Sequence, residues 1–238
     1  MRDQYAGDVS DFIKFAFLRA LAGKDRALGV AWYYAPGEDG RPDGRHLEWR
    51  DEMAWHVLDK ELHTALLTLP ERSVAALEKA LFWPCGTLFH REPMPSSVGR
   101  SAWAVRKRST LSTAKIVFLD PDNGIGKESE KHATASEIRL LRGAGRAIAF
   151  ITFPGRKMKH HALLEQLHER MIAETGTKNL ITLRTNISVP RAGSTSFVQR
   201  QRWFTVVDPD AELTSRAQAF ALALEAVPRM RAVLHLTT

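Results

Sequence analysis

Strand-like and helix-like segments alternate along most of this 238-residue chain. Apolar, β-rich runs occur at 28–36, 86–93, 115–121 and 146–155, and helical patterns occupy 9–23, 50–82, 99–112, 134–143, 160–176 and 212–227. Strands that alternate with helices form mainly parallel sheets that are covered on both faces. Two further runs, 179–185 and 200–209, have no helix between them, so we expect them to pair antiparallel at one edge. The sequence therefore predicts a single α/β domain over residues 1–238.

The charge of the chain favours a polyanionic partner. Lys and Arg total 34 against 27 Asp and Glu, which gives a formal net charge of +7. Basic residues also gather beside aromatic residues or histidines in 99–109, 154–161 and 191–203, a combination that single-stranded nucleic acids use for backbone contacts and base stacking. We therefore expect RNA or DNA as a partner, with the following candidate contact residues: Arg156, Lys157, Lys159, Arg191, Arg200 and Arg202.

Other features concern the location of the protein and metal binding. No apolar run approaches the roughly 18 residues that span a bilayer, and the N-terminus lacks a basic-then-apolar signal pattern. Cys85 is the single cysteine, so it has no partner for an internal disulfide or a CxxC zinc motif. No carboxylate is fixed by sequence beside His160, His161 and His168, and we predict no metal site there. These features favour a cytoplasmic protein without a membrane segment.

The most informative local stretch is "AKIVFLDPDNGIG", residues 114–126. An apolar strand stops at Asp120-Pro121-Asp122-Asn123, and in parallel sheets ligands bind at the carboxyl ends of the strands. The simplest interpretation is a turn, because Asp and Asn side chains bond to nearby backbone amides. Two interpretations give the same residues a chemical role.

The first chemical interpretation is a phosphohydrolase. Four apolar residues followed by Asp-x-Asp resemble the first motif of haloacid-dehalogenase-type enzymes. That resemblance implies a nucleophilic Asp120, an acid/base Asp122 and a bound Mg²⁺. It also implies later motifs, for which the candidates here are Thr152, Lys157 or Lys159, and Asp208 or Asp210.

The second chemical interpretation starts at the N-terminus. "YAGDVSDFIKFAFLRAL", residues 5–21, resembles the opening of the ribosomal-RNA adenine-N6 methyltransferases, which begin H-x-G-N-x-x-D-x-x-K-H. Gly7 matches the glycine, Asp8 stands in place of the asparagine, and Asp11 and Lys14 keep the Asp-x-x-Lys spacing. Residues three apart share one face of a helix, so Asp11 and Lys14 point the same way.

The order of the later motifs agrees with that family. Residues 36–40 fall where the family has its glycine-rich cofactor loop, and 116–124 fall where it has the Asp-Pro-Pro-Tyr motif, here Asp-Pro-Asp-Asn. Asp122 replaces the second proline and Asn123 replaces the aromatic residue that stacks on a flipped base. The resemblance implies S-adenosylmethionine as cofactor. It implies cofactor contacts at Asp8, Asp11, Lys14, Gly37 and Gly40, and catalytic roles for Asp120, Pro121, Asp122 and Asn123.

We expect the N-terminal helix to pack beside the carboxyl ends of the strands. Charged residues on so apolar a helix need a polar destination or partners. Such packing brings Asp8, Asp11 and Lys14 near Asp120. A third interpretation, a non-catalytic nucleic-acid-binding protein on the same scaffold, makes use of the same site.

Overall fold

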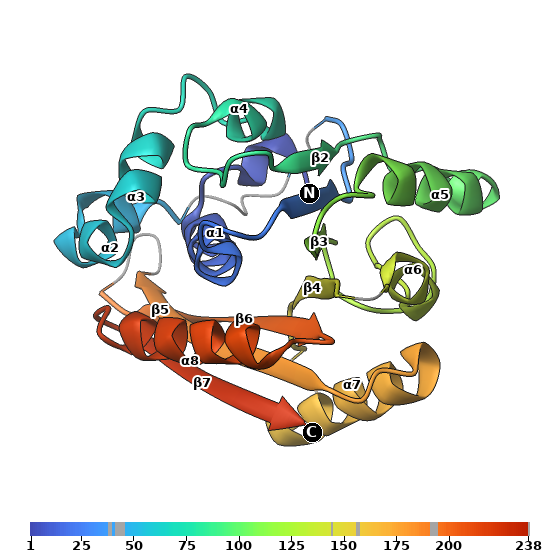
Figure 1. Cartoon of the computed structure of the whole chain (residues 1–238). Helices are drawn as coiled ribbons and strands as arrows, with labels where there is room; N and C mark the ends of the chain where they lie inside the picture. Colours follow the sequence, from blue (N-terminus) through green and yellow to red (C-terminus); the bar gives the residue numbers. More distant parts are fainter. Residues whose placement is uncertain (38–39, 41–45, 144, 156–157, 191–194, 238) are drawn as a thin grey trace.

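The computed structural model describes residues 1–37, 40, 46–143, 145–155, 158–190 and 195–237, and its centre is one seven-stranded sheet. The strand order is β2-β1-β3-β4-β6-β5-β7 (Figure 1). The strands are β1 (Leu28–Trp32), β2 (Leu88–His90), β3 (Ile116–Asp120), β4 (Ala147–Thr152), β5 (Leu180–Pro190), β6 (Phe197–Val207) and β7 (Met230–Thr237).

The sheet has a parallel half and an antiparallel half. Strands β2, β1, β3 and β4 are parallel, whereas β6 is antiparallel to both β4 and β5. The expected antiparallel pairing of the last two predicted strands is thus confirmed. β6 lies between β4 and β5. β7, which was not predicted from the sequence, pairs antiparallel with β5 and forms the edge of the sheet.

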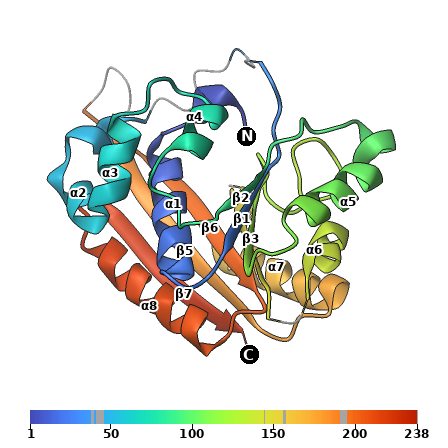
Figure 2. The same cartoon turned by 45° about the horizontal axis from the view of Figure 1, so that its top comes forward.

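The helix that precedes the sheet, α1 (Val9–Ala22), is buried along nearly its whole length. The Asp8 side chain begins it by accepting a hydrogen bond from the backbone N of Asp11 at 3.0 Å, and Gly23 ends it with a φ of 58°. Such an N-cap satisfies one of the free backbone donors of the first turn. Figure 2 shows α1 lying against the sheet, with contacts to the neighbouring α3 (Lys60–Leu67) and α8 (Ala211–Glu225).

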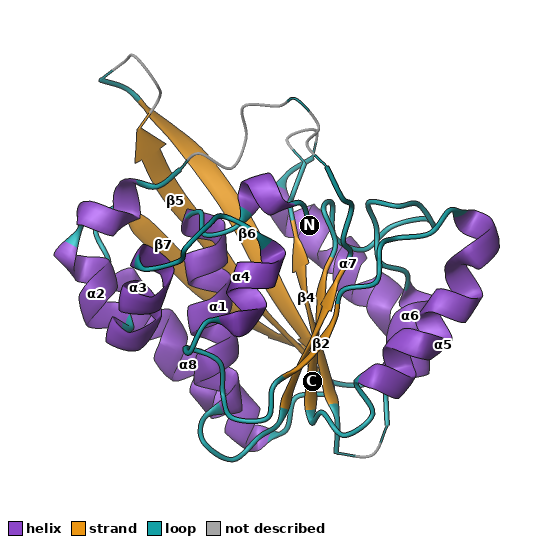
Figure 3. Cartoon of the chain, turned by 90° about the horizontal axis from the view of Figure 1, so that it is seen from above, coloured by secondary structure: helices purple, strands orange, loops and turns teal. Residues whose placement is uncertain are grey.

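Helices cover both faces of the sheet (Figure 3). Helices α1, α3, α8, α2 (Met53–Leu58) and α4 (Val74–Lys79) lie on one face, and α5 (Arg100–Thr110), α6 (Ala135–Leu141) and α7 (His160–Thr175) lie on the other. Short 3-10 turns occur at Asp3–Tyr5, Glu48–Asp51 and Ser97–Gly99. In β3, Ile116 and Phe118 enter one apolar core while Val117 and Leu119 enter the other. Burial on both faces explains why this strand reads as a continuous apolar run.

The order of the strands reverses between β1 and β3. From β1 the chain first adds β2 on one side and then β3 on the other, with Trp32 paired to Asp120 at their carboxyl ends. Such a reversal is where open α/β sheets bind ligands. The architecture is the predicted α/β class, with one mostly parallel sheet that has an antiparallel edge. No helix within the described ranges is long and apolar enough to cross a bilayer.

Candidate functional site

A buried ammonium group joins two carboxylates at the strand-order reversal. Lys14 Nζ lies 2.6 Å from Asp11 Oδ1 and 2.9 Å from Asp120 Oδ2, and all three residues are buried. Asp11 Oδ2 also accepts a hydrogen bond from the backbone N of Gly7 at 2.8 Å. The expectation that the N-terminal helix brings Asp11 and Lys14 to Asp120 is therefore confirmed.

Aromatic rings surround the ammonium group. Lys14 Nζ lies 4.9 Å from the ring centre of Phe15 and 5.4 Å from that of Trp32, close enough for cation–π attraction. Trp32 is the last residue of β1 and Asp120 is the last residue of β3. Lys14 therefore connects α1 to the ends of the two central parallel strands.

The charges in this cluster shift one another's protonation. Burial alone would lower the pKa of Lys14, but the carboxylates of Asp11 and Asp120 outweigh burial and hold that pKa above its usual value. Burial raises the pKa of Asp11 to about 6 against the attraction of Lys14, and Asp8 and Asp120 raise it further. One ammonium group thus pairs with two acids, and Asp11 holds its proton more readily than an ordinary aspartate does.

Asp122 is bound from the other side by the first residue of the chain. The amino group of Met1 lies 2.7 Å from Asp122 Oδ1 and donates to the carbonyl oxygen of Tyr33 at 2.6 Å. The carbonyl of Met1 accepts from the backbone N of Ala35 at 3.0 Å. Met1 therefore lies between the segment that follows β1 and the turn that follows β3.

The turn after Asp120 is packed tightly against β4. Asn123 donates its backbone N–H to the carbonyl of Lys131 at 2.9 Å. Gly124 has a φ of 90°, and a Cβ atom there would lie 2.9 Å from the Cα of Thr152. Only glycine combines that φ with such a close backbone approach. The glycine of the Asp-Pro-Asp-Asn-Gly run thus fixes the position of the acids.

These residues line a cavity of about 310 Å³. Its walls come from α1, from the turn after β3 and from β6: Asp8, Asp11, Lys14, Asp120, Pro121, Asp122, Asn123, Arg200 and Arg202. The cavity lies at the low end of the range for small-molecule sites. The predicted catalytic residues and three of the predicted cofactor-binding residues therefore share one cavity.

The β5–β6 hairpin brings two of the predicted basic residues to this cavity. The last pair between β4 and β6 joins Thr152 to Trp203, so the first residues of β6 extend past the end of β4, as Figure 3 shows. Arg200 and Arg202 lie in this extension and line the cavity. Arg202 Nε donates to Ser10 Oγ of α1 at 2.9 Å, and its guanidinium carbon lies 4.7 Å from the ring centre of Phe153.

Other predicted residues lie away from the cavity or outside the described residues. Gly37 and Gly40 are not among the described residues that line it, because Met1 lies between Asp122 and the segment after β1. Lys159 is the exposed N-cap of α7 and does not line the cavity. Three basic candidates fall outside the described residues: Arg156, Lys157 and Arg191.

Several residues of the cavity wall were not predicted from the sequence. They are Met1, Tyr5, Ser10, His46, Lys131, Ile151 and Phe153. Tyr5 and Ser10 lie inside the stretch that carries the N-terminal resemblance, so that stretch could have indicated them. His46 and Lys131 lie in irregular segments, and no periodic pattern marked them.

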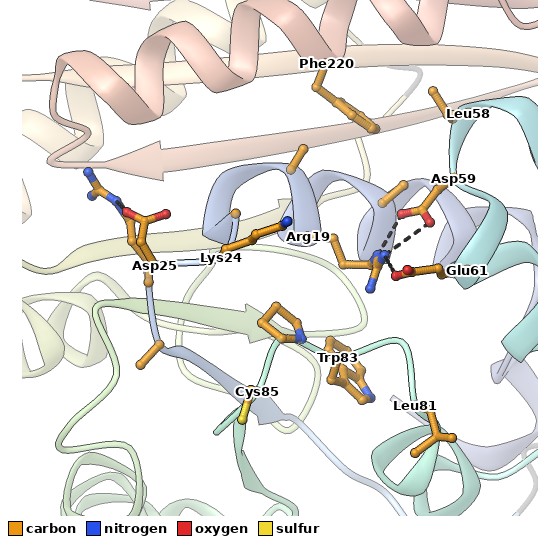
Figure 4. A pocket seen from close by; sticks show the side chains of 16 residues that line it. Arg19, Lys24, Asp25, Leu58, Asp59, Glu61, Leu81, Trp83, Cys85 and Phe220 are labelled. Carbon is orange, nitrogen blue, oxygen red and sulfur yellow. Dashed lines mark hydrogen bonds and ion pairs between the residues drawn. The ribbon is translucent and has the colours of Figure 1, made fainter.

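A larger cavity of about 780 Å³ lies at the opposite end of the sheet. Figure 4 shows that Arg19, the basic residue at its centre, is bound by the two acids beside it. Arg19 Nε lies 2.7 Å from Asp59 Oδ2, and Arg19 Nη2 lies 2.8 Å from Glu61 Oε2. Because these charges pair with one another and the cavity lies away from the carboxyl ends of the parallel strands, we do not assign the site there.

The structure argues against the phosphohydrolase interpretation. β6 runs antiparallel, so Asp208 and Asp210 lie at the end of the sheet opposite to Asp120. Asp208 Oδ2 is 2.5 Å from Arg142 Nε, and Asp210 caps α8. Neither can complete a site with Asp120. Among the described residues, no group of three or more His, Cys, Asp or Glu side chains is placed to hold a metal ion.

Comparison with known proteins gave one kind of match. No family model and no curated protein matches the chain. Among solved structures, the chain is similar to an S-adenosylmethionine-dependent methyltransferase from Agrobacterium tumefaciens, with 13% identity and a TM-score of 0.37. The match covers 86% of this chain but only 62% of that one, so this chain spans less than two thirds of the length of that structure.

Proposed function

We propose that this protein is an S-adenosylmethionine-dependent methyltransferase that acts on a base of RNA or DNA. The observation that carries the proposal is the buried Lys14 shared by Asp11 and Asp120 in the wall of the cavity at the strand-order reversal. Burying two carboxylates and an ammonium group is costly, and such an arrangement is retained where it performs a task.

Asp120 has the chemistry to recognise an amino group on a base. Its Oδ2 accepts from Lys14 Nζ at 2.9 Å, which fixes the orientation of the carboxylate. An ionised carboxylate accepts hydrogen bonds only, so it favours an exocyclic amino group over a carbonyl. Lys14 acts here as a positioning residue.

The cavity also fits the charges of the proposed cofactor. S-adenosylmethionine supplies an electrophilic methyl group on a sulfonium, and it carries an ammonium group as well. Asp8 and Asp122 line the same cavity as Asp120. Their negative charges suit those positive charges, in addition to the hydrogen bond that Asp8 accepts from the backbone N of Asp11 and the ion pair of Asp122 with the amino group of Met1. The rings of Tyr5 and Phe153 line it too and offer apolar surfaces for an adenine.

A nucleic acid is the substrate class that the basic residues favour. The chain carries a formal charge of +7, and Arg200 and Arg202 line the cavity on a hairpin that extends past the end of β4. A polyanion that approaches the carboxyl ends of the strands would meet both arginines.

Calorimetric titration tests whether the cofactor binds. We expect S-adenosylhomocysteine to bind the wild-type protein, and we expect a variant of an exposed acid outside the cavity, Asp51→Asn, to bind it equally well. Binding of Mg²⁺ without any binding of S-adenosylhomocysteine would refute the methyltransferase proposal.

A further inference from the structure

Arg200 has a buried hydrogen-bond donor that no group in the described part of the chain uses. Its Nε atom is buried and has no hydrogen-bond partner in the described part of the chain, and its side chain lines the cavity. An unsatisfied buried donor is destabilising, and more so when the group is charged. Arginine also presents its donors as a rigid fork that matches the two oxygens of a carboxylate or phosphate.

The neighbouring arginine of the same strand face is bound differently. Arg202 donates to Ser10 Oγ at 2.9 Å and to the carbonyl of Gln201 at 2.7 Å, and it lies over the ring of Phe153. These contacts tie Arg202 to α1 and to the end of β4. Arg202 thus fixes the hairpin in place, whereas Arg200 keeps its Nε donor for another group.

The acids of the cavity already have other partners. Asp11 and Asp120 share Lys14, Asp122 binds the amino group of Met1, and Asp8 accepts from the backbone N of Asp11. The cavity is therefore divided between an acidic wall on α1 and the β3 turn and a basic wall on β6. A ligand with a cationic part and an anionic part would match this division.

We propose that Arg200 is the oxyanion anchor of the cavity and binds a carboxylate or phosphate group through its Nε and a terminal nitrogen. The inference rests on the proposed function for the identity of the ligand. Two sources carry the required chemistry: the carboxylate of the methionine part of the cofactor, and a backbone phosphate of the nucleic acid.

Two variants of Arg200 and one control test the anchor. Arg200→Gln removes the charge, Arg200→Lys keeps the charge but removes the fork, and Arg231→Gln removes a charge from an exposed position of β7. The probes are S-adenosylhomocysteine, 5′-methylthioadenosine, which lacks the amino-acid part, and single-stranded and double-stranded oligonucleotides. Circular dichroism and thermal melting establish that each variant is folded.

If Arg200 binds the cofactor carboxylate, Arg200→Gln weakens the binding of S-adenosylhomocysteine at least about tenfold and leaves the binding of 5′-methylthioadenosine unchanged. If Arg200 binds a phosphate, the same variant weakens the binding of the oligonucleotides instead. It also reduces the slope of log affinity against log salt concentration by about one. Arg200→Lys restores only part of the loss, and Arg231→Gln changes neither.

Unchanged binding of every probe by both folded Arg200 variants would overturn the anchor. Failure of the proposed function has a different signature. In that case the wild-type protein binds neither S-adenosylhomocysteine nor 5′-methylthioadenosine, while the oligonucleotide titrations still decide whether Arg200 binds an oxyanion.

Discussion

At the scale of single residues, the site depends on how one ammonium group is divided among the acids around it. Lys14 contacts Asp11 and Asp120 directly, and Asp8 adds a further negative charge nearby. Because both contacts are buried, the loss of Lys14 would leave two acids without a cationic partner in a poorly solvated position. The charges of this cluster therefore affect both the stability of the protein and the geometry of its proposed site.

The raised pKa of Asp11 predicts a specific pH dependence. Its folded-state pKa is about 6 against an ordinary 3.8, so the folded chain binds this proton more tightly than the unfolded chain. The free energy of unfolding of the wild type should then fall as pH rises from about 4 to 6, by up to about 3 kcal/mol relative to Asp11→Asn. Urea unfolding of both proteins across this range measures the difference. Parallel profiles would show that Asp11 titrates normally.

Positions of single residues could be predicted from the sequence where a general rule of helix and sheet packing applied to them. Lys14 and Asp120 lie 106 positions apart, yet their meeting follows from an apolar helix with two charges and a strand that ends in acids. The positions of Met1, His46 and Lys131 depend on irregular segments, which carry no periodic pattern to extrapolate. Gly37 and Gly40 were assigned by resemblance alone, and the structure leaves them out of the cavity wall.

At the scale of elements, a second buried ionic cluster joins the helices on the opposite face of the sheet. Glu137 of α6 accepts from Arg100 Nε of α5 at 2.8 Å and from Tyr33 Oη, just after β1, at 2.7 Å. Lys107 of α5 lies 3.5 Å from the same carboxylate. Tyr33 also binds Met1 through its backbone carbonyl, so this cluster supports the far wall of the proposed site.

Removing the carboxylate from this cluster should be costly. Burial alone would raise the pKa of Glu137, but Lys107 and Arg100 outweigh it and lower that pKa to about 2. The contribution to stability is therefore present above the ordinary pKa of about 4.5 and lost as pH falls through 2. Glu137→Gln leaves two buried cations without their anion and should cost about 3–5 kcal/mol at neutral pH.

Urea unfolding at pH 7 measures this cost, with Glu130→Gln at an exposed position as the matched control. We expect the control to change the free energy of unfolding by less than about 0.5 kcal/mol. An equal and small effect of both substitutions would mean that the cluster adds nothing to stability.

The elements themselves were largely predictable, because helices and buried strands leave periodic or continuous apolar patterns. β7 was not predicted, because only Met230 and Ala232 of its residues are buried. The alternation of apolar and polar residues is therefore too short to indicate a strand. Its partner β5 extends to Pro190 rather than 185, because the hairpin with β6 continues past the rest of the sheet. That extension depends on pairing between strands and not on either strand alone.

At the scale of the whole molecule, a net charge of +7 and the hairpin arginines predict salt-sensitive binding of nucleic acid. Neutralising three phosphates gives a slope of roughly −2 to −3 in a plot of log affinity against log salt concentration. Fluorescence anisotropy with labelled single-stranded and double-stranded RNA and DNA measures this slope. The absence of any binding at about 50 mM salt, where electrostatic binding is strong, would contradict the nucleic-acid assignment.

Under the proposed function, the buried Asp120 at the strand-order reversal serves methyl transfer to nucleic acid. The most direct measurement is the incorporation of labelled methyl from S-adenosylmethionine into RNA and DNA by the wild type, Asp120→Asn and the control Asp51→Asn. We predict incorporation by the wild type and the control, and a loss of about 100-fold or more in Asp120→Asn, with nucleic-acid binding retained. No incorporation by the wild type into any nucleic acid, or equal incorporation by Asp120→Asn, would contradict this role of Asp120.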